Sequence, residues 1–343
     1  MRFVDLRSDT KTLPTSEMRE AIFNAELGDD CAGEDQTVNN LEELAAKVLG
    51  KEAAVLVSSG TQGNLTALLS HCDRGDEVLL GRQSHIFRAE AMGASVLGGI
   101  ALMPLNDDEG YISLEEIEQS IRVNDSRYPN TKLLALENTH NGSGGTPLSK
   151  AYLDDCSDIA HLKGISVHID GARLFNASVA LNIKPSELVN SIDTVTFCLS
   201  KGLAAPVGSL LVGDKDFINK ARRWRKMLGS AMRQSGIIAA AGIVSINMMI
   251  ERLKEDHLNA KKLANGLNNI PGISIEVEKF QTNMVFCSVD NGKGEWLTET
   301  LSDKGILVGH VGNSVLRLVT HNDISSDDID YTIKSIQQIL LDK

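Results

Sequence analysis

Two stretches of sequence decide the fold of this chain: Ile165-Ser166-Val167-His168-Ile169-Asp170-Gly171 and Thr194-Val195-Thr196-Phe197-Cys198-Leu199-Ser200-Lys201. Each is a short run of apolar and β-branched residues, which is typical of a strand in an α/β protein. The first ends on a carboxylate, Asp170, and the second delivers an amine, Lys201. Side chains alternate across a strand, so His168 and Asp170 share one face. Because ligands bind at the carboxyl ends of strands in open α/β sheets, we expect Asp170 and Lys201 to meet there.

This pair of side chains suits pyridoxal 5'-phosphate (PLP). The ring nitrogen of PLP must stay protonated to draw electrons from a substrate carbanion, and a fixed carboxylate such as Asp170 keeps it so. The aldehyde of PLP forms a Schiff base with a lysine, and Lys201 is the candidate. Taken singly, Asp170 would more often be a turn residue and Lys201 a solvated surface lysine. Together with the segments below, they predict a PLP site.

A third segment has the pattern of a phosphate site. Residues 53–57 predict a buried strand, residues 58–61 a tight turn, and the segment from Gly63 a helix start. Free backbone N–H groups and the helix dipole converge at such a point and favour an anion. Such turns often bind nothing, so this segment supports the PLP site without identifying it.

Further strings of residues extend the pattern along the chain. They are Asp5-Leu6-Arg7-Ser8-Asp9-Thr10 and residues 28–30, 33–35, 59–61, 84–86, 137–141, 232–234 and 316–321. With these strings the chain resembles the low-specificity L-threonine aldolases of the β-eliminating lyase group, which are fold-type I PLP-dependent enzymes. The resemblance implies a transferase-like α/β fold, with helices on both faces of a mainly parallel sheet and a small α+β C-terminal domain. It also implies retro-aldol cleavage of L-threonine, L-allo-threonine and other β-hydroxy-α-amino acids to glycine and an aldehyde.

The resemblance also implies roles for individual residues. The expected catalytic residues are Lys201, His85 and Asp170, with His85 stacked on the PLP ring and acting as the base itself or through a water. The expected cofactor-binding residues are Ser59, Gly60, Thr61, His85, Asp170, Arg173, Ser200, Lys201 and Arg233. The expected substrate-binding residues are Ser8, Arg173, Arg317 and Arg127. A planar guanidinium suits the substrate carboxylate because it donates two parallel hydrogen bonds.

The resemblance extends to assembly, and the sequence departs from it at two positions. Arg233 matches a residue that reaches the cofactor phosphate of a neighbouring subunit, which implies a homotetramer, a dimer of dimers with shared active sites. Ala32 stands where relatives usually carry a tyrosine, and Arg127 where many carry a histidine. Both positions lie near the substrate in the family, so we expect weak discrimination between L-threonine and L-allo-threonine.

Length and pattern predict two domains. The chain has 343 residues, enough for about two domains with a sizeable core. We expect a large PLP-binding domain over 16–250, and a small domain over 251–343 that packs with the N-terminal segment 1–15. Seven strands are predicted in the large domain, at 53–57, 77–80, 100–104, 133–137, 165–170, 194–199 and 208–212. After residue 250 we expect a helix over 251–267, strands at 273–277, 283–289 and 314–319, and a helix near 326–341.

Charge and composition exclude other classes of protein. Acidic side chains outnumber basic ones, 46 to 34, and the resulting formal charge of −12 disfavours nucleic acid as a partner. The basic cluster at 220–226 is interpreted as the exposed face of a helix. The longest apolar stretch, 236–250, is too short for a membrane span. Five scattered cysteines and an acidic amino terminus predict a cytoplasmic protein with reduced thiols.

Other functions remain open on the residues alone. A β-eliminating lyase, a racemase or an aminotransferase would share Asp170, Lys201 and the phosphate turn. A metal-dependent hydrolase could use His161, His168 and Asp170, although their spacing matches no recognised metal-ligand motif and we expect no metal. A non-catalytic binding protein would have no use for the lysine beyond the second strand.

Overall fold

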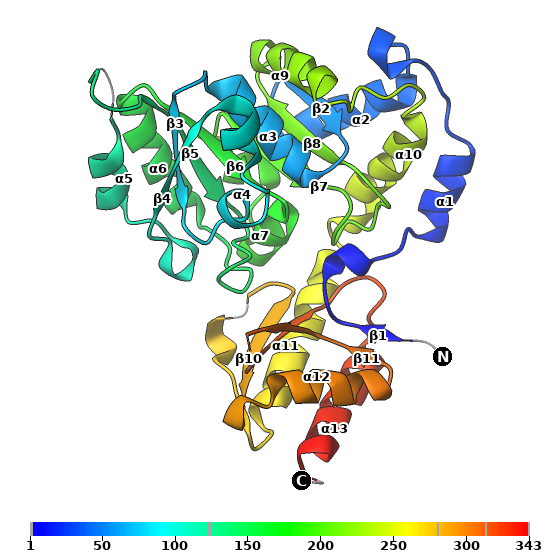
Figure 1. Cartoon of the computed structure of the whole chain (residues 1–343). Coiled ribbons are helices and arrows are strands. Elements are labelled where there is room, and N and C mark those ends of the chain that lie inside the picture. The colour runs from blue at the N-terminus through cyan, green and yellow to red at the C-terminus, as the bar shows by residue number, and fades with distance from the viewer. Residues whose placement is uncertain (1–2, 123–124, 280, 313, 342–343) are drawn as a thin grey trace.

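The computed structural model describes residues 3–122, 125–279, 281–312 and 314–341. The chain forms a larger body around a seven-stranded sheet and a smaller body around a four-stranded sheet (Figure 1). The predicted segments 1–15 and 251–343 include residues 1–2, 280, 313 and 342–343, which lie outside the described residues.

The larger sheet has the strand order β2-β8-β7-β6-β5-β3-β4. Its strands are β2 (Ala53–Val57), β3 (Glu77–Gly81), β4 (Ala101–Leu105), β5 (Thr131–Glu137), β6 (Ser166–Asp170), β7 (Thr194–Cys198) and β8 (Ser209–Gly213). Neighbouring strands from β4 to β7 pair in parallel, and only β8 runs against both of its neighbours. The predicted mainly parallel sheet is therefore confirmed, with strand ends within two residues of those expected.

Helices cover both faces of this sheet. They are α1 (Ser16–Phe23), α2 (Gln36–Leu49), α3 (Gly60–His71), α4 (His85–Arg88), α5 (Leu114–Ser120), α6 (Lys150–Leu162), α7 (Leu174–Leu181), α8 (Pro185–Leu188), α9 (Lys215–Met227) and α10 (Gly236–Val244). Alternate strand residues separate the two faces. Val167 and Ile169 of β6 pack into the core formed with α2, α6 and α10, whereas Leu133 and Ala135 of β5 pack toward α3. His168 and Asp170 therefore face α3, as their alternation predicts.

Two local predictions in the larger body need correction. Helix α3 begins at Gly60 and not at Gly63, because the Ser59 hydroxyl accepts the N–H of Gln62 and caps the helix earlier. The basic cluster lies on α9, but Arg225 is buried, donates to the Leu56 carbonyl oxygen and pairs with Asp30. The prediction of an exposed basic face is thus wrong at this position.

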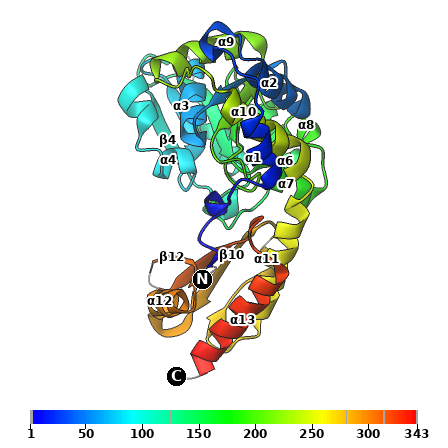
Figure 2. The ribbon, with the colours of Figure 1, turned by 90° about the vertical axis from the view of Figure 1, so that its right-hand side faces the viewer.

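The smaller body follows α11 (Leu253–Asn268), which runs from one body to the other (Figure 1). Its antiparallel sheet has the order β12-β13-β10-β9. The strands are β9 (Ile273–Ser274), β10 (Met284–Val289), β12 (Gly309–Val311) and β13 (Val315–Val319), and the later helices are α12 (Gly294–Asp303) and α13 (Ser326–Leu341). Figure 2 shows α11 and α13 side by side along one side of this sheet. The strand predicted at 273–277 stops at Ser274, where its pairing with β10 ends.

The N-terminal segment packs with the smaller body. Strand β1 (Val4–Asp5) pairs in parallel with β11 (Ile306–Leu307), and Leu6 joins the apolar core of the smaller body. A second apolar core lies in the larger body and extends to Leu253. These two cores support a domain boundary near residues 250 and 251, which stays a proposal.

Among the described residues, no single helix is long and apolar enough to cross a membrane. One pair, Gly236–Met249 with Leu253–Asn268, meets the length and composition criteria only when the two are taken together, and it is bent by 65°.

A buried ion pair joins the segments that surround the sheet edge. Asp9 accepts two hydrogen bonds of 2.7 Å from the guanidinium of Arg173, which lies between β6 and α7. The amide of Asn283, just before β10, donates to the same carboxylate at 3.3 Å. One carboxylate therefore connects the N-terminal segment, the larger sheet and the smaller sheet. Burial alone would raise the pKa of Asp9, but the charge and hydrogen bonds of Arg173 outweigh burial and lower this pKa.

Replacing Asp9 with asparagine is expected to destabilise the protein by about 3–5 kcal/mol, because the Arg173 charge would stay buried without a partner. Urea unfolding near neutral pH measures the change. Because the folded pKa is depressed, the wild-type contribution is complete above the ordinary carboxyl pKa and declines as the pH falls through the folded value. Asp125→Asn, in an exposed pair with Arg127, is the control and should change little. An equal loss in both variants would contradict this reading.

Candidate active site

Asp170 and Lys201 lie at the same edge of the larger sheet. Asp170 is the last residue of β6, and Lys201 follows the end of the neighbouring parallel strand β7. The Lys201 ammonium makes no hydrogen bond or ion pair with any residue that the structure describes. Its charge lowers the pKa of both Asp9 and His85, which places it close to these two groups. The sequence prediction that brings a carboxylate and a free amine to one edge agrees with this geometry.

The Asp170 carboxylate is held by two donors. One oxygen accepts the backbone N–H of Ala172 at 3.1 Å, and the other accepts the side-chain amide of Asn64 at 2.8 Å. The same amide nitrogen donates to Glu90 at 2.8 Å, and Glu90 in turn lies 2.8 Å from Nδ1 of His85. A continuous network thus links Asp170 to His85 through Asn64 and Glu90.

Several carboxyl groups crowd this network. Burial, reinforced by the charge of Asp170, raises the pKa of Glu90 and of Glu137. Glu137 ends β5 and accepts the backbone N–H groups of His85 and Asn141 at 2.7 and 2.8 Å. The hydrogen bond with Glu90 raises the pKa of His85. His85 is therefore held at its backbone by one carboxyl group and at its ring by another.

The turn before α3 has the features expected of a phosphate site. Ser59 caps Gln62, which leaves the N–H groups of Gly60 and Thr61 in the first turn without a partner inside the helix. The helix packs closely on the sheet at Gly63, where an added Cβ would lie 2.5 Å from Cγ2 of Thr196. Only a small residue at position 63 lets the first turn of α3 pack this closely against the strands.

These observations together fit PLP. An ionised carboxylate suits the ring nitrogen, and an unpaired lysine suits the aldehyde. The free N–H groups of a helix start suit the phosphate. Ser200 directly precedes Lys201 and is half-buried. Its predicted role in binding the cofactor stays a prediction.

Two arginines lie close together near this edge. Arg317 of β13 donates to the Arg7 carbonyl at 2.9 Å and to the Asn141 side chain at 3.1 Å. Burial and then the charge of Arg173 lower the pKa of Arg317, so the two guanidinium groups repel each other. Nε and one terminal nitrogen of Arg173 are occupied by Asp9, which leaves its other terminal nitrogen. Two neighbouring cations of this kind favour an anionic ligand.

Ser8, Arg233 and Arg127 have contacts that bear differently on their predicted roles. The Ser8 hydroxyl accepts the N–H of Thr10, next to the carbonyl that Arg317 binds. Arg233 is exposed and donates to Asp29 at 2.8 Å. Arg127 is exposed, pairs with Asp125 and precedes the amino end of β5, whereas Asp170 ends the adjacent strand. The structure therefore does not bring Arg127 to the Asp170 edge within one chain.

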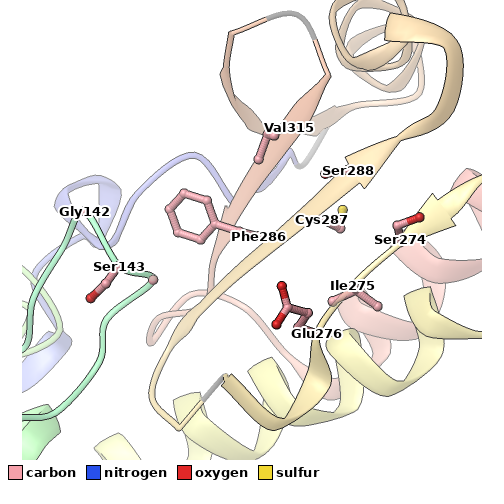
Figure 3. Close-up of a pocket in the computed structure, with 10 residues that line it drawn as sticks. Gly142, Ser143, Ser274, Ile275, Glu276, Phe286, Cys287, Ser288 and Val315 are labelled. Atoms are coloured by element: carbon pink, nitrogen blue, oxygen red, sulfur yellow. The ribbon is translucent and has the colours of Figure 1, made fainter. Parts of the chain in front are cut away.

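A pocket of about 450 Å³ opens near the strand that carries Arg317. It lies between the loop Gly142–Gly144 and the smaller sheet, and Figure 3 shows Phe286 pointing toward this loop. Phe286 is paired in register with Arg317, and Asn141, which Arg317 contacts, directly precedes the loop. The pocket therefore borders the arginine side of the site.

The alternative metal site does not form. His161 is exposed and pairs with Asp193 at 2.9 Å, whereas His168 is buried and contacts Asn64 and Thr194. Within the described ranges, a different set has metal-ligating atoms within 4.8 Å of one another, namely His85, Glu90 and Asp170. These three belong to the network already described.

Sequence reasoning missed Asn64, Glu90, Glu137 and Asp9 as parts of the site. Glu137 and Asp9 lie in strings that carry the resemblance, which was the available signal. Asn64 and Glu90 had no such signal, because their contacts depend on how α3 and the segment after α4 pack on the sheet.

Comparisons with known proteins give a consistent picture. The family model described as Beta-eliminating lyase matches residues 5–290. The chain is 47% identical to low-specificity L-threonine aldolase 1 of Arabidopsis thaliana, with 99% of this chain and 97% of the relative covered. It is 44% identical to the low specificity L-threonine aldolase of Escherichia coli strain K12, with 95% and 96% covered. A solved threonine aldolase of Leishmania major has a TM-score of 0.85 at 18% identity, with 98% and 99% covered, and shows that the fold is shared.

Replacing Glu90 with glutamine is expected to lower the pKa of His85, because the charged acceptor that stabilises the imidazolium is removed. An NMR titration of the His85 ring measures this shift. In the wild type the raised folded pKa stabilises the protein below the ordinary histidine pKa, and this contribution is lost as the pH rises through the folded value. Glu43→Gln, exposed on α2, is the control. A His85 pKa that is unchanged in Glu90→Gln would show that another group sets it.

Proposed function

The chain belongs to the β-eliminating lyase family, among its low-specificity L-threonine aldolases, and from this premise we propose how its site works. The enzyme cleaves L-threonine and related β-hydroxy-α-amino acids to glycine and an aldehyde with PLP as cofactor. The observation that carries the assignment is the Asp170 carboxylate beside the unpaired Lys201 at one edge of the larger sheet. The other PLP reactions considered above share these two residues, and the glycine and aldehyde products distinguish this one.

We propose that the residues at the sheet edge hold PLP at three points. Asp170 would keep the ring nitrogen protonated, Lys201 would hold the aldehyde, and the N–H groups of Gly60 and Thr61 would bind the phosphate. When bound, PLP withdraws electrons from the α-carbon of the substrate. The two donors to Asp170, at 2.8 and 3.1 Å, keep its carboxylate oriented.

The arginines are the proposed site of the substrate carboxylate. Arg317 can exchange its contact with the Asn141 side chain for a carboxylate oxygen. The terminal nitrogen of Arg173 that Asp9 leaves free can support the same carboxylate. Holding the carboxylate at two oxygens fixes the rotation of the substrate, and so the direction of the bond between its α- and β-carbons.

His85 is the proposed base for the β-hydroxyl proton. Nδ1 of the ring is held by Glu90 at 2.8 Å, which leaves Nε2 as the atom that can take a proton. The carboxyl group at Nδ1 stabilises the ring after it becomes charged. His85 thus needs no metal ion to accept this proton.

We also propose that the enzyme is a cytoplasmic homo-oligomer. Arg233 is exposed in the single chain, and α1 and α10 present Phe23 and Ile237 to the surface. A second copy that covers these residues would bring Arg233 to a neighbouring phosphate site, and Arg127 would act at a β-carbon only through such a neighbour. All five cysteines carry free thiols, in keeping with a reducing compartment.

Borohydride treatment of the PLP-loaded enzyme is expected to attach the cofactor covalently to Lys201, and peptide mapping locates it. Lys201→Ala should lose essentially all release of glycine and acetaldehyde from L-threonine, because Lys201 is the lysine whose charge acts on Asp9 and His85 at the site. Lys226→Ala, on the outer helix α9, is the control and should keep its activity. A label on another lysine, or no label, would overturn the assignment.

Arg317→Lys is expected to reduce kcat/KM for L-threonine by about tenfold to a hundredfold, because an ammonium cannot donate two parallel hydrogen bonds to one carboxylate. Both KM and kcat should change, since the clamp sets orientation as well as affinity. Steady-state kinetics measure both, with Arg19→Lys on α1 as the control. Full activity in Arg317→Lys would move the carboxylate contact to Arg173.

A further inference from the structure

A chain of hydrogen bonds runs behind Asp170 into the core. His71 of α3 places Nε2 2.8 Å from Oγ1 of Thr194, and Nδ1 of His168 lies 2.9 Å from the same oxygen. Nε2 of His168 lies 3.3 Å from Oδ1 of Asn64, whose amide nitrogen reaches Asp170. Thr194, His168 and Asn64 are all buried. The mechanism above uses only the last link of this chain.

Each hydrogen bond in this series can have its donor on one side only. The amide nitrogen of Asn64 donates to two carboxylates, Asp170 and Glu90, so its oxygen must face His168. His168 therefore carries its proton on Nε2. Burial lowers the pKa of His168 to about 3, so its ring is neutral and its Nδ1 is an acceptor. The Thr194 hydroxyl must donate to that nitrogen and accept from Nε2 of His71.

The far end of the chain is fixed as well. Burial lowers the pKa of His71 to about 4, so this ring is also neutral. The ring of His71 packs against Phe217 of α9, with centroids 4.4 Å apart. If the Asn64 side-chain amide rotated by half a turn, its oxygen would point at the two carboxyl groups of Asp170 and Glu90. The hydrogen bonds from His71 through Thr194 to His168 prevent this rotation.

We propose that Asn64, locked by the hydrogen bonds of His71, Thr194 and His168, is a positioning residue that keeps the Asp170 carboxylate aimed at the ring nitrogen of PLP. By donating to both Asp170 and Glu90, Asn64 holds two carboxyl groups side by side. The loss of this amide orientation would remove the donor from which both carboxyl groups accept. The role of Asp170 in this proposal rests on the proposed function. The donor-to-acceptor direction of the hydrogen bonds from His71 to Asn64 does not.

The test compares three threonine variants of the apoenzyme and holoenzyme. Thr194→Val removes the hydroxyl and is expected to raise the Kd for PLP and to lower kcat by about threefold to tenfold each, with little change in the KM for L-threonine. Thr194→Ser restores the hydroxyl and should recover both values. Thr66→Val is the matched control, because Thr66 lies on the same helix as Asn64 and its buried hydroxyl has no hydrogen-bond partner among the described residues.

Nitrogen-15 NMR of the wild-type apoenzyme tests the chain even if Thr194→Val fails to fold. We expect a neutral His168 ring with its proton on Nε2, and a neutral His71 ring with its proton on Nε2. A His168 proton on Nδ1 would overturn the proposal, as would a Thr194→Val enzyme that matches Thr66→Val in PLP affinity and kcat. If the wild type neither binds PLP nor cleaves L-threonine, the proposed function fails instead.

Discussion

The ion pair between Asp9 and Arg173 is the contact on which the arrangement of the site depends. It is buried, it is bidentate at 2.7 Å, and it joins segments from the beginning and the middle of the chain. Asn283 attaches the smaller sheet to the same carboxylate. Because Asp9 follows Arg7 and Ser8 directly, the pair also places the carbonyl that Arg317 binds. One electrostatic contact therefore both holds the two bodies together and sets the position of the proposed carboxylate clamp.

The site gathers acidic and basic side chains. The acidic ones are Asp9, Asp170, Glu90 and Glu137, and the basic ones are Arg173, Arg317, Lys201 and His85. Burial, and after it the charge of Asp170, raises the pKa of Glu90 and of Glu137. Each charge is held by a neutral amide, a backbone N–H or an opposite charge, as burial requires. The exception is the Lys201 amine, and that is the group expected to react.

The sequence predicted the sheet edge well and the surroundings of the site poorly. Asp170 and Lys201 could be placed at one edge because strand ends and alternating faces are local properties of the chain. The start of α3 was placed late because the Ser59 cap is a matter of one hydrogen bond. Arg225 and Asn64 could not be placed, since their partners come from distant segments. The resemblance gave Arg127 a role by its position in the sequence, but the structure places this residue before the amino end of β5, away from the Asp170 edge.

The pairing of β1 with β11 bears on how the enzyme matures during synthesis. Strand β1 has its partner in β11, far later in the sequence, so it stays unpaired during synthesis until Ile306 and Leu307 have emerged. Asp9 follows this strand, and Asn283 and Arg317 also arrive late. The larger body can fold earlier, because its seven strands lie within residues 53–213. During synthesis the edge of the larger sheet can therefore form before Arg317, a residue of the proposed substrate clamp, has emerged.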